Sequence, residues 1–123
     1  MSGISYLLDT NVVIGLLQGH PPALVLRETK QLEFENCAVS QITRMELLSF
    51  PDLQAEEENA IRGFLDNTVV LLLSDSIEKA AIALRRKLKI HLPDAIIAAT
   101  AQINRLELLT LDERLRKALA TPI

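Results

Sequence analysis

The chain has 123 residues, of which 49% are hydrophobic and only 3% aromatic, and its formal net charge is −3. This length favours a single domain, over residues 1–123, with an aliphatic core. The acidic balance argues against a protein that coats nucleic acid through general positive charge. The one cysteine, Cys37, excludes an internal disulfide and a multi-cysteine zinc site, and no apolar run approaches the ~18 residues of a membrane span. We therefore expect a soluble, cytoplasmic protein.

The N-terminal half of the chain alternates short apolar runs with longer helical patterns. In chain order we expect a strand, two helices, a second strand and two further helices, at 4–8, 10–18, 20–31, 37–40, 41–50 and 54–67. Gly19 is a suitable terminator for the first helix, and Pro51 ends the third. The pattern indicates strands and helices that follow one another along the chain.

The C-terminal half continues the same alternation. We expect a strand at 69–73, a helix at 77–89 and a second helix that starts just past Pro93. A strand at 107–110 and a last helix at 112–119 follow. The helix at 77–89 has three candidate N-caps, Ser74, Asp75 and Ser76. The strand at 69–73 is the most distinct, because it is β-branched and wholly apolar. Uniformly apolar strands between helices predict an α/β fold with a parallel sheet covered on both faces.

Four carboxylates fall at strand ends or on apolar helix faces. Asp9 directly follows the first predicted strand, and Asp112 lies two residues past the last one. Glu46 lies on or beside the apolar face of the helix after the second strand, and Asp94 opens a helix whose next seven residues carry no charge. In open α/β sheets, functional groups gather outside the carboxyl ends of the strands. We therefore treat the four residues as one candidate cluster.

Each of these carboxylates also has a purely structural interpretation. Asp9, Asp94 and Asp112 suit helix N-caps, and Glu46 suits an ordinary surface position. As a group, however, they would repel one another in a cleft unless a cation neutralised them. Carboxylate oxygens are preferred ligands of Mg²⁺ and Mn²⁺, and such ions activate water and stabilise charge on a phosphoryl group. The pattern predicts a divalent metal site.

Four segments of the chain resemble the signature segments of the PIN domain, in the same order. They are YLLDTNVVI, VSQITRMELL, LPDAIIAATA and LLTLDERL. The similarity is greatest to the small VapC-type toxins of toxin–antitoxin pairs, and it covers essentially the whole chain. It implies a three-layer α/β/α sandwich with a central parallel sheet. The strands at 4–8 and 107–110 would be neighbours at its centre, with Asp9 beside Asp112.

The resemblance also implies an activity, metal-dependent endoribonuclease cleavage of RNA that leaves a 5′-phosphate and a 3′-hydroxyl. Asp9, Glu46 and Asp94 match the family's acidic triad, and Asp112 matches its fourth acidic position. These four residues would be catalytic and would hold one or two Mg²⁺ or Mn²⁺ ions. The accompanying polar positions are matched by Asn11, Thr43 and Thr110.

Partners follow from the same resemblance. A toxin of this type would form a homodimer, act on an RNA substrate and bind no membrane. A cognate antitoxin would inhibit it by covering the active-site groove with its tail. Two features depart from the family pattern. Leu115 stands where relatives often have an aromatic residue, and only Thr-Pro-Ile at 121–123 is left to form a further strand.

A basic run precedes Asp94 and offers a candidate contact for RNA phosphates. It consists of Arg85, Arg86, Lys87 and Lys89. Phosphate contacts of this kind rest on charge. A solvated helix face is an equal alternative, since most charge runs are of that kind.

Two other functions remain open from the sequence. LLDTNVV is similar to the opening motif of haloacid dehalogenase-like phosphatases, although Asn11 stands where that motif has a second Asp and no matching lysine motif follows. The other function is that of a degenerate PIN-like domain, which binds RNA or a protein without catalysis. The four carboxylates argue against it, because a binding surface gains little from a repulsive cluster.

Overall fold

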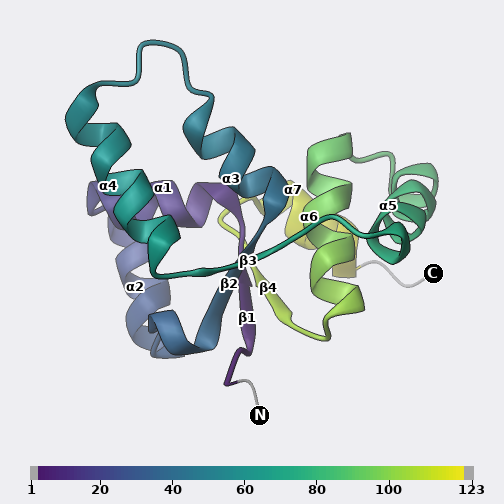
Figure 1. Cartoon of the computed structure of the whole chain (residues 1–123). Coiled ribbons are helices and arrows are strands. Elements are labelled where there is room, and N and C mark those ends of the chain that lie inside the picture. The colour runs from purple at the N-terminus through teal and green to yellow at the C-terminus, as the bar shows by residue number, and fades with distance from the viewer. Residues whose placement is uncertain (1–2, 121–123) are drawn as a thin grey trace.

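A four-stranded parallel sheet lies between two layers of helices in the computed structural model, which describes residues 3–120 (Figure 1). The strands are β1 (Tyr6–Leu8), β2 (Cys37–Ser40), β3 (Val69–Leu71) and β4 (Glu107–Leu109), in the spatial order β3-β2-β1-β4. Because every neighbouring pair is parallel, the carboxyl ends of the strands lie at one edge of the sheet. The predicted α/β sandwich with a central parallel sheet is confirmed.

Seven α-helices connect and follow the strands in the described part of the chain. They are α1 (Thr10–Gln18), α2 (Pro21–Lys30), α3 (Gln41–Leu48), α4 (Ala55–Asp66), α5 (Asp75–Leu88), α6 (Leu92–Ile103) and α7 (Glu113–Ala120). A 3-10 helix, Phe34–Asn36, precedes β2 and has no counterpart in the sequence prediction, because its signal is a short polar capping box with no apolar periodicity. None of the helices within residues 3–120 has the length and apolar character needed to cross a membrane.

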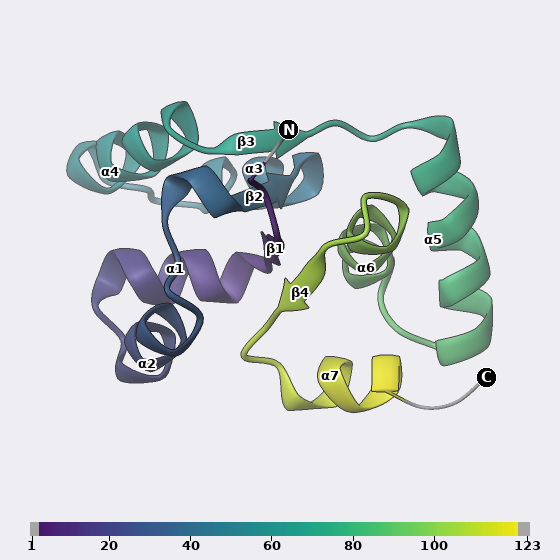
Figure 2. The same cartoon turned by 90° about the horizontal axis from the view of Figure 1, so that it is seen from below.

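The two faces of the sheet are buried against different helices (Figure 2). On one face a cluster joins the strands to α1, α3 and α4, and it includes Leu8, Val12, Val13, Val39, Leu47, Ile61 and Leu109. On the other face, Leu7 and Ala38 pack against Ile97 and Ala101 of α6. Further out, α5 packs on α6 largely through alanines and other aliphatic side chains. The core is aliphatic, and burial of each large side chain contributes roughly 1.5–3 kcal/mol.

Local signals decide where three helices begin or end. The carboxylate of Asp9 accepts a hydrogen bond at the N-terminus of α1, and Gly19 ends that helix in the left-handed conformation, at φ 68°. Among the three candidate caps of α5, Ser74 is the N-cap and accepts from the backbone N–H of Ile77. His91 is the N-cap residue of α6, which therefore begins at Leu92, one residue before the proline.

Three helix N-termini meet at the carboxyl edge of the sheet. Helices α1 and α3 each start directly after a strand, β1 and β2 respectively. Helix α6 runs in the opposite direction to β4, because only residues 104–106 separate its C-terminus from the start of that strand (Figure 1). Helix α3 contacts both α1 and α6 at this edge. The fold therefore brings Asp9, Glu46 and Asp94 toward one end of the sheet.

The structure corrects two expectations about the sheet. Strands β1 and β4 are neighbours as predicted, but β1 and β2 occupy the centre, and β4 is an edge strand within residues 3–120. The apolar run at 69–73 forms a strand only as far as Leu71, and Leu72 and Leu73 are exposed. An apolar run does not distinguish a central strand from an edge, because pairing is decided by the rest of the sheet. The expectation for residues 121–123 lies outside the described residues.

We expect the contact between α1 and α2 to exclude any side chain at Gly15. An added Cβ would lie 2.7 Å from the Cβ of Ala23, so Gly15→Ala should lower the free energy of unfolding by about 1–3 kcal/mol despite alanine's higher helix propensity. Gly63→Ala in α4 is the matched control, since an added Cβ there meets no atom within 4 Å, and it should stabilise by up to about 1 kcal/mol. Urea unfolding of both variants measures the difference. Equal effects would contradict the close approach of α1 and α2.

Candidate functional site

The carboxylate of Asp9 is buried at the carboxyl end of β1, with 4% of the residue exposed. Its Oδ1 accepts a hydrogen bond from the backbone N–H of Thr10 at 2.7 Å, and its Oδ2 accepts one from the Thr110 hydroxyl, also at 2.7 Å. Burial raises the pKa of Asp9, these two hydrogen bonds lower it, and the negative charges of Asp94 and Glu46 raise it further. Asp9 is therefore a desolvated carboxylate beside other acids.

Thr10 connects this carboxylate to Glu46 on α3. Its hydroxyl donates to Oε1 of Glu46 at 2.6 Å, and it lies 3.0 Å from the hydroxyl of the fully buried Thr43. The site residues predicted from sequence include Glu46 and Thr43 but not Thr10. The signal was present, because Thr10 is a polar residue inside a run of apolar ones. Only the packing of α3 on α1 shows what its hydroxyl binds.

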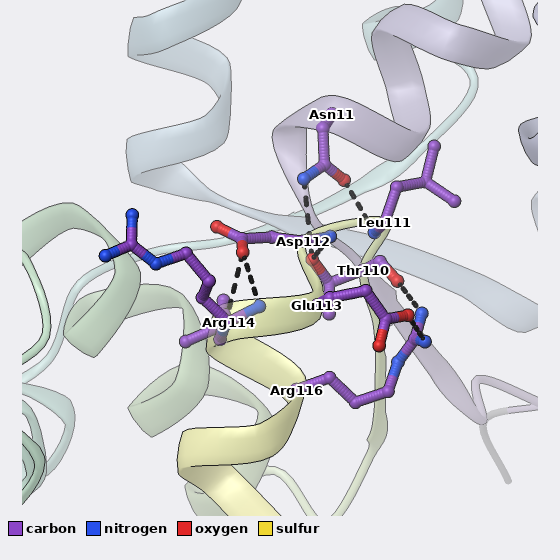
Figure 3. A network of polar contacts seen from close by, with 8 residues as sticks. Asn11, Thr110, Leu111, Asp112, Glu113, Arg114 and Arg116 are labelled. Carbon is purple, nitrogen blue, oxygen red and sulfur yellow. Dashed lines mark hydrogen bonds and ion pairs between the residues drawn. The ribbon is translucent and has the colours of Figure 1, made fainter.

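Thr110 organises the turn between β4 and α7 (Figure 3). Besides donating to Asp9, its hydroxyl accepts hydrogen bonds from the backbone N–H of Asp112 at 3.0 Å and from Nδ2 of Asn11 at 3.4 Å. The Oδ1 of Asn11 in turn accepts from the backbone N–H of Leu111 at 3.1 Å. Two of the predicted polar residues, Asn11 and Thr110, thus hold the turn that carries Asp112 against the start of α1.

Asp94 lies in the first turn of α6, and its carboxylate differs from the others in its hydrogen bonding. It accepts no hydrogen bond from any residue between 3 and 120, and the N-cap position belongs to His91. Burial raises the pKa of Asp94, as do the negative charges of Asp112 and Glu46, whereas His91 lowers it. The capping interpretation of Asp94 is therefore wrong, and no hydrogen bond from the described residues holds its side chain.

The capping interpretation holds for two of the other carboxylates. Asp9 is the N-cap of α1, and Oδ1 of Asp112 accepts from the backbone N–H groups of Arg114 and Leu115 at the start of α7, at 2.9 and 3.2 Å. Capping uses one oxygen of Asp112 and leaves the other without a hydrogen bond within residues 3–120. A structural role and a role in a cluster are thus compatible in the same side chain.

Electrostatic coupling joins the four acids into one group. The charge of Glu46 acts on both Asp9 and Asp94, and Asp94 also interacts with Asp9 and with Asp112. Each of these interactions disfavours ionisation, because the charges have the same sign. A divalent cation among them would reverse that effect. Hard carboxylate oxygens are also the donor type that Mg²⁺ and Mn²⁺ prefer.

The acids fit such an ion by charge and donor type, but they do not form a closed cage. Within residues 3–120, no three His, Cys, Asp or Glu side chains lie close enough together to surround one metal ion. Like charges without a counter-ion separate, and here hydrogen bonds to Thr10, Thr110 and the start of α7 hold three of the four. Side-chain movement would therefore accompany metal binding.

The basic run lies outside these hydrogen bonds. Arg85, Arg86 and Lys87 are exposed in the last turn of α5, and Lys89 is its C-cap residue. His91, which interacts with Asp94, follows two residues later. Leu115, at the position where an aromatic residue was expected, is the buried residue of α7, with 2% exposure.

A cavity in the described part of the chain lies away from the acidic cluster. It has a volume of about 390 Å³ and is lined mainly by apolar side chains of α1, the 3-10 helix and α4, among them Leu16, Phe34 and Phe64. None of the four carboxylates lines it.

Comparisons with known proteins agree with this geometry. The chain matches the PIN domain over residues 6–119. It is 31% identical over 113 residues to ribonuclease VapC19 of Mycobacterium tuberculosis, covering 88% of this chain and 89% of that protein.

Solved structures show the same similarity. A toxin–antitoxin complex from Klebsiella pneumoniae contains a chain that is 37% identical, with a TM-score of 0.76 over 88% of this chain and 87% of that one. The DNA-bound VapBC complex of Salmonella typhimurium shares the fold, with a TM-score of 0.77 at 24% identity over 93% of this chain and 91% of that chain. The resemblance inferred from four sequence segments is thereby confirmed. This chain belongs to the PIN domain family.

Proposed function

We propose that this protein is a divalent-metal-dependent endoribonuclease and the toxin of a toxin–antitoxin pair, acting in the cytoplasm. The observation that supports this most directly is the buried carboxylate of Asp9, coupled to Glu46 and Asp94 at the carboxyl edge of the sheet. Desolvated like charges cost stability unless a ligand compensates. In a chain of the PIN family, acids placed together at a cost in stability would form a binding site for a cation. The bound cation would in turn bind the phosphodiester of RNA.

In this proposal the metal is held by Asp9, Glu46, Asp94 and Asp112. When bound, Mg²⁺ or Mn²⁺ would supply an activated water and stabilise negative charge on the phosphate. By the family resemblance, the products would carry a 5′-phosphate and a 3′-hydroxyl. The protein's own task is to orient the oxygens. Thr10 orients Glu46, Thr110 orients Asp9, and the N-terminus of α7 orients Asp112. Asp94, whose carboxylate accepts no hydrogen bond within residues 3–120, would adjust to the ion.

RNA has to approach a region that repels phosphate. We propose that Arg85, Arg86, Lys87 and Lys89 supply the compensating positive charge. These side chains are exposed, and the chain passes from them directly into α6, which carries Asp94. Such contacts position a backbone without reading its sequence. The basic run would therefore raise the affinity for RNA without selecting its nucleotide sequence.

The first test of the proposed function is RNA cleavage by the purified protein. Wild-type protein should cleave a mixed-sequence RNA with Mg²⁺ or Mn²⁺ and lose this activity with EDTA. Asp94→Asn should lower the rate by roughly a hundredfold or more, because the site loses a charge that the cation requires. Asp75→Asn, also an aspartate in the first turn of a helix but exposed and outside the cluster, should cleave normally. Metal-independent cleavage, or binding without cleavage, would contradict the proposal, and the latter would favour a degenerate domain.

A second test uses the metal-free protein and needs no substrate. At neutral pH, Asp94→Asn should raise the melting temperature by roughly 2–4 °C, because it removes a charge that burial and two neighbouring acids disfavour. The folded-state pKa of Asp94 is raised, so its destabilising effect is complete above that pKa. The effect fades as the pH falls toward the ordinary value of 3.8, and the two melting temperatures should converge there.

The matched control separates repulsion from the helix dipole. Asp75→Asn loses the favourable interaction of an anion with a helix N-terminus and nothing else, so its melting temperature should stay the same or fall slightly. If Asp94→Asn behaves like Asp75→Asn at every pH, then Asp94 serves only its helix and the cluster is not under electrostatic strain.

The toxin assignment predicts a specific protein partner. The similarity to VapC19 and to the Klebsiella toxin–antitoxin complex supports a cognate antitoxin as partner, and we propose that the free protein is a homodimer. Co-expression with the product of a small neighbouring gene should yield a stable complex without RNA cleavage, whereas the free protein should scatter light as a dimer. A monomer that cleaves RNA and ignores the neighbouring product would retain the enzyme and exclude the toxin role.

A further inference from the structure

An arginine of α7 binds the backbone of the turn that carries Asp112 (Figure 3). Nη2 of Arg116 donates to the carbonyl oxygen of Thr110 at 2.6 Å, and its Nη1 pairs with the carboxylate of Glu113. The backbone N–H of Arg116 also donates to the carbonyl oxygen of Asp112 at 3.0 Å. The guanidinium thus joins α7 to the end of β4.

This contact lies where the sheet stops supporting the backbone. The last backbone hydrogen bond between β1 and β4 in the described structure runs from the N–H of Asp9 to the carbonyl oxygen of Leu109, at 2.9 Å. The next carbonyl, that of Thr110, accepts its hydrogen bond from Arg116 instead (Figure 3). The hydroxyl of the same Thr110 is bonded to Asp9 and to the backbone of Asp112. One residue therefore connects Arg116 to two of the four acids.

The ion pair between Arg116 and Glu113 is a weak stabilising interaction by itself. Both side chains are more than half exposed, at 52% and 64%, and exposed pairs of this kind contribute little to stability. A hydrogen bond from a charged guanidinium to a carbonyl is stronger and more directional than a neutral one. The pair with Glu113 restricts the rotamers of Arg116. Its effect is to keep the guanidinium on the Thr110 carbonyl.

We propose that Arg116, oriented by Glu113, is a positioning residue that fixes the β4–α7 turn, so that the Thr110 hydroxyl stays on Asp9 and Asp112 stays beside Asp94. The inference rests on the proposed nuclease function. Outer partners of metal-binding carboxylates set their orientation, and losing such a partner commonly costs ten- to a hundredfold in metal affinity or activity. The guanidinium of Arg116 reaches the four carboxylates only through Thr110 and does not touch them.

The competing role for an exposed arginine at this edge is direct contact with RNA phosphate. The two roles differ in what Glu113 does. If Arg116 positions the turn, Glu113→Gln weakens the orientation of the guanidinium and impairs the site. If Arg116 binds RNA, Glu113→Gln removes a competing anion, and RNA should bind at least as tightly as to wild type.

The experiment compares Arg116→Gln, Arg116→Lys and Glu113→Gln with the control Arg114→Gln. Arg114 is exposed in the same turn of α7, and only its backbone, not its side chain, takes part in a hydrogen bond of the described structure. The control changes the net charge by the same amount as Arg116→Gln. For each full-length variant, kcat and KM are measured on one RNA over a range of Mn²⁺ concentrations. Mn²⁺ binding without RNA is measured separately by paramagnetic resonance, and circular dichroism checks the fold.

Positioning predicts a graded pattern. Arg116→Gln should weaken Mn²⁺ binding by about tenfold and lower kcat with little change in KM. Arg116→Lys, which keeps one donor for the carbonyl, should recover part of the loss, and Glu113→Gln should show a smaller loss in the same direction. Arg114→Gln should match wild type. If Arg116→Gln does not fold, the lysine and Glu113 variants carry the same comparison.

Other outcomes overturn the proposal. A raised KM with unchanged kcat and unchanged Mn²⁺ binding would assign Arg116 to RNA, and equal losses in Arg116→Gln and Arg114→Gln would show a general charge effect. Normal Mn²⁺ binding in all variants would also contradict it. If wild-type protein neither binds Mn²⁺ nor cleaves RNA, the proposed function fails. If wild type does both and Arg116→Gln equals it, only the inference about Arg116 fails.

Discussion

The hydrogen bond from the Thr110 hydroxyl to the buried carboxylate of Asp9 is the interaction on which the rest of the site depends. It joins two residues that are 101 positions apart in the chain, at the ends of the neighbouring strands β1 and β4. A carboxylate with 4% exposure requires such partners, because desolvation without them is costly. Through this bond the parallel pairing of two strands determines where the last acid of the chain lies.

Hydrogen bonding is distributed unevenly among the four acids, and this distribution has a physical logic. Asp9, Glu46 and Asp112 each accept at least one hydrogen bond, which limits their rotation. Asp94 accepts none within residues 3–120 and is exposed to the field of its neighbours. A cluster built in this way has three constrained members and one adjustable member. In the absence of a cation it is a local source of instability in an otherwise well-packed aliphatic fold.

Much of this could be predicted from the sequence because the relevant signals are local. Apolar runs between helical patterns predicted the parallel sheet, and the polar interruption after the first run marked Asp9. The prediction failed where the decision is not local. The run at 69–73 looked like the best strand, yet it became a short edge with Leu72 and Leu73 exposed. The position of β4 at the edge of the described sheet depends likewise on pairing.

By itself, the sequence determined the fold class and marked the four acids as candidates, since hydrophobic periodicity and residue chemistry act over a few positions. Only the tertiary structure decided how those acids are held. Thr10 binds Glu46 because α3 packs on α1, and Arg116 reaches the Thr110 carbonyl because α7 folds back on the end of β4. Hydrogen bonds have narrow requirements of distance and angle. Whether two distant polar residues meet those requirements depends on the packing of the elements between them, which no local pattern specifies.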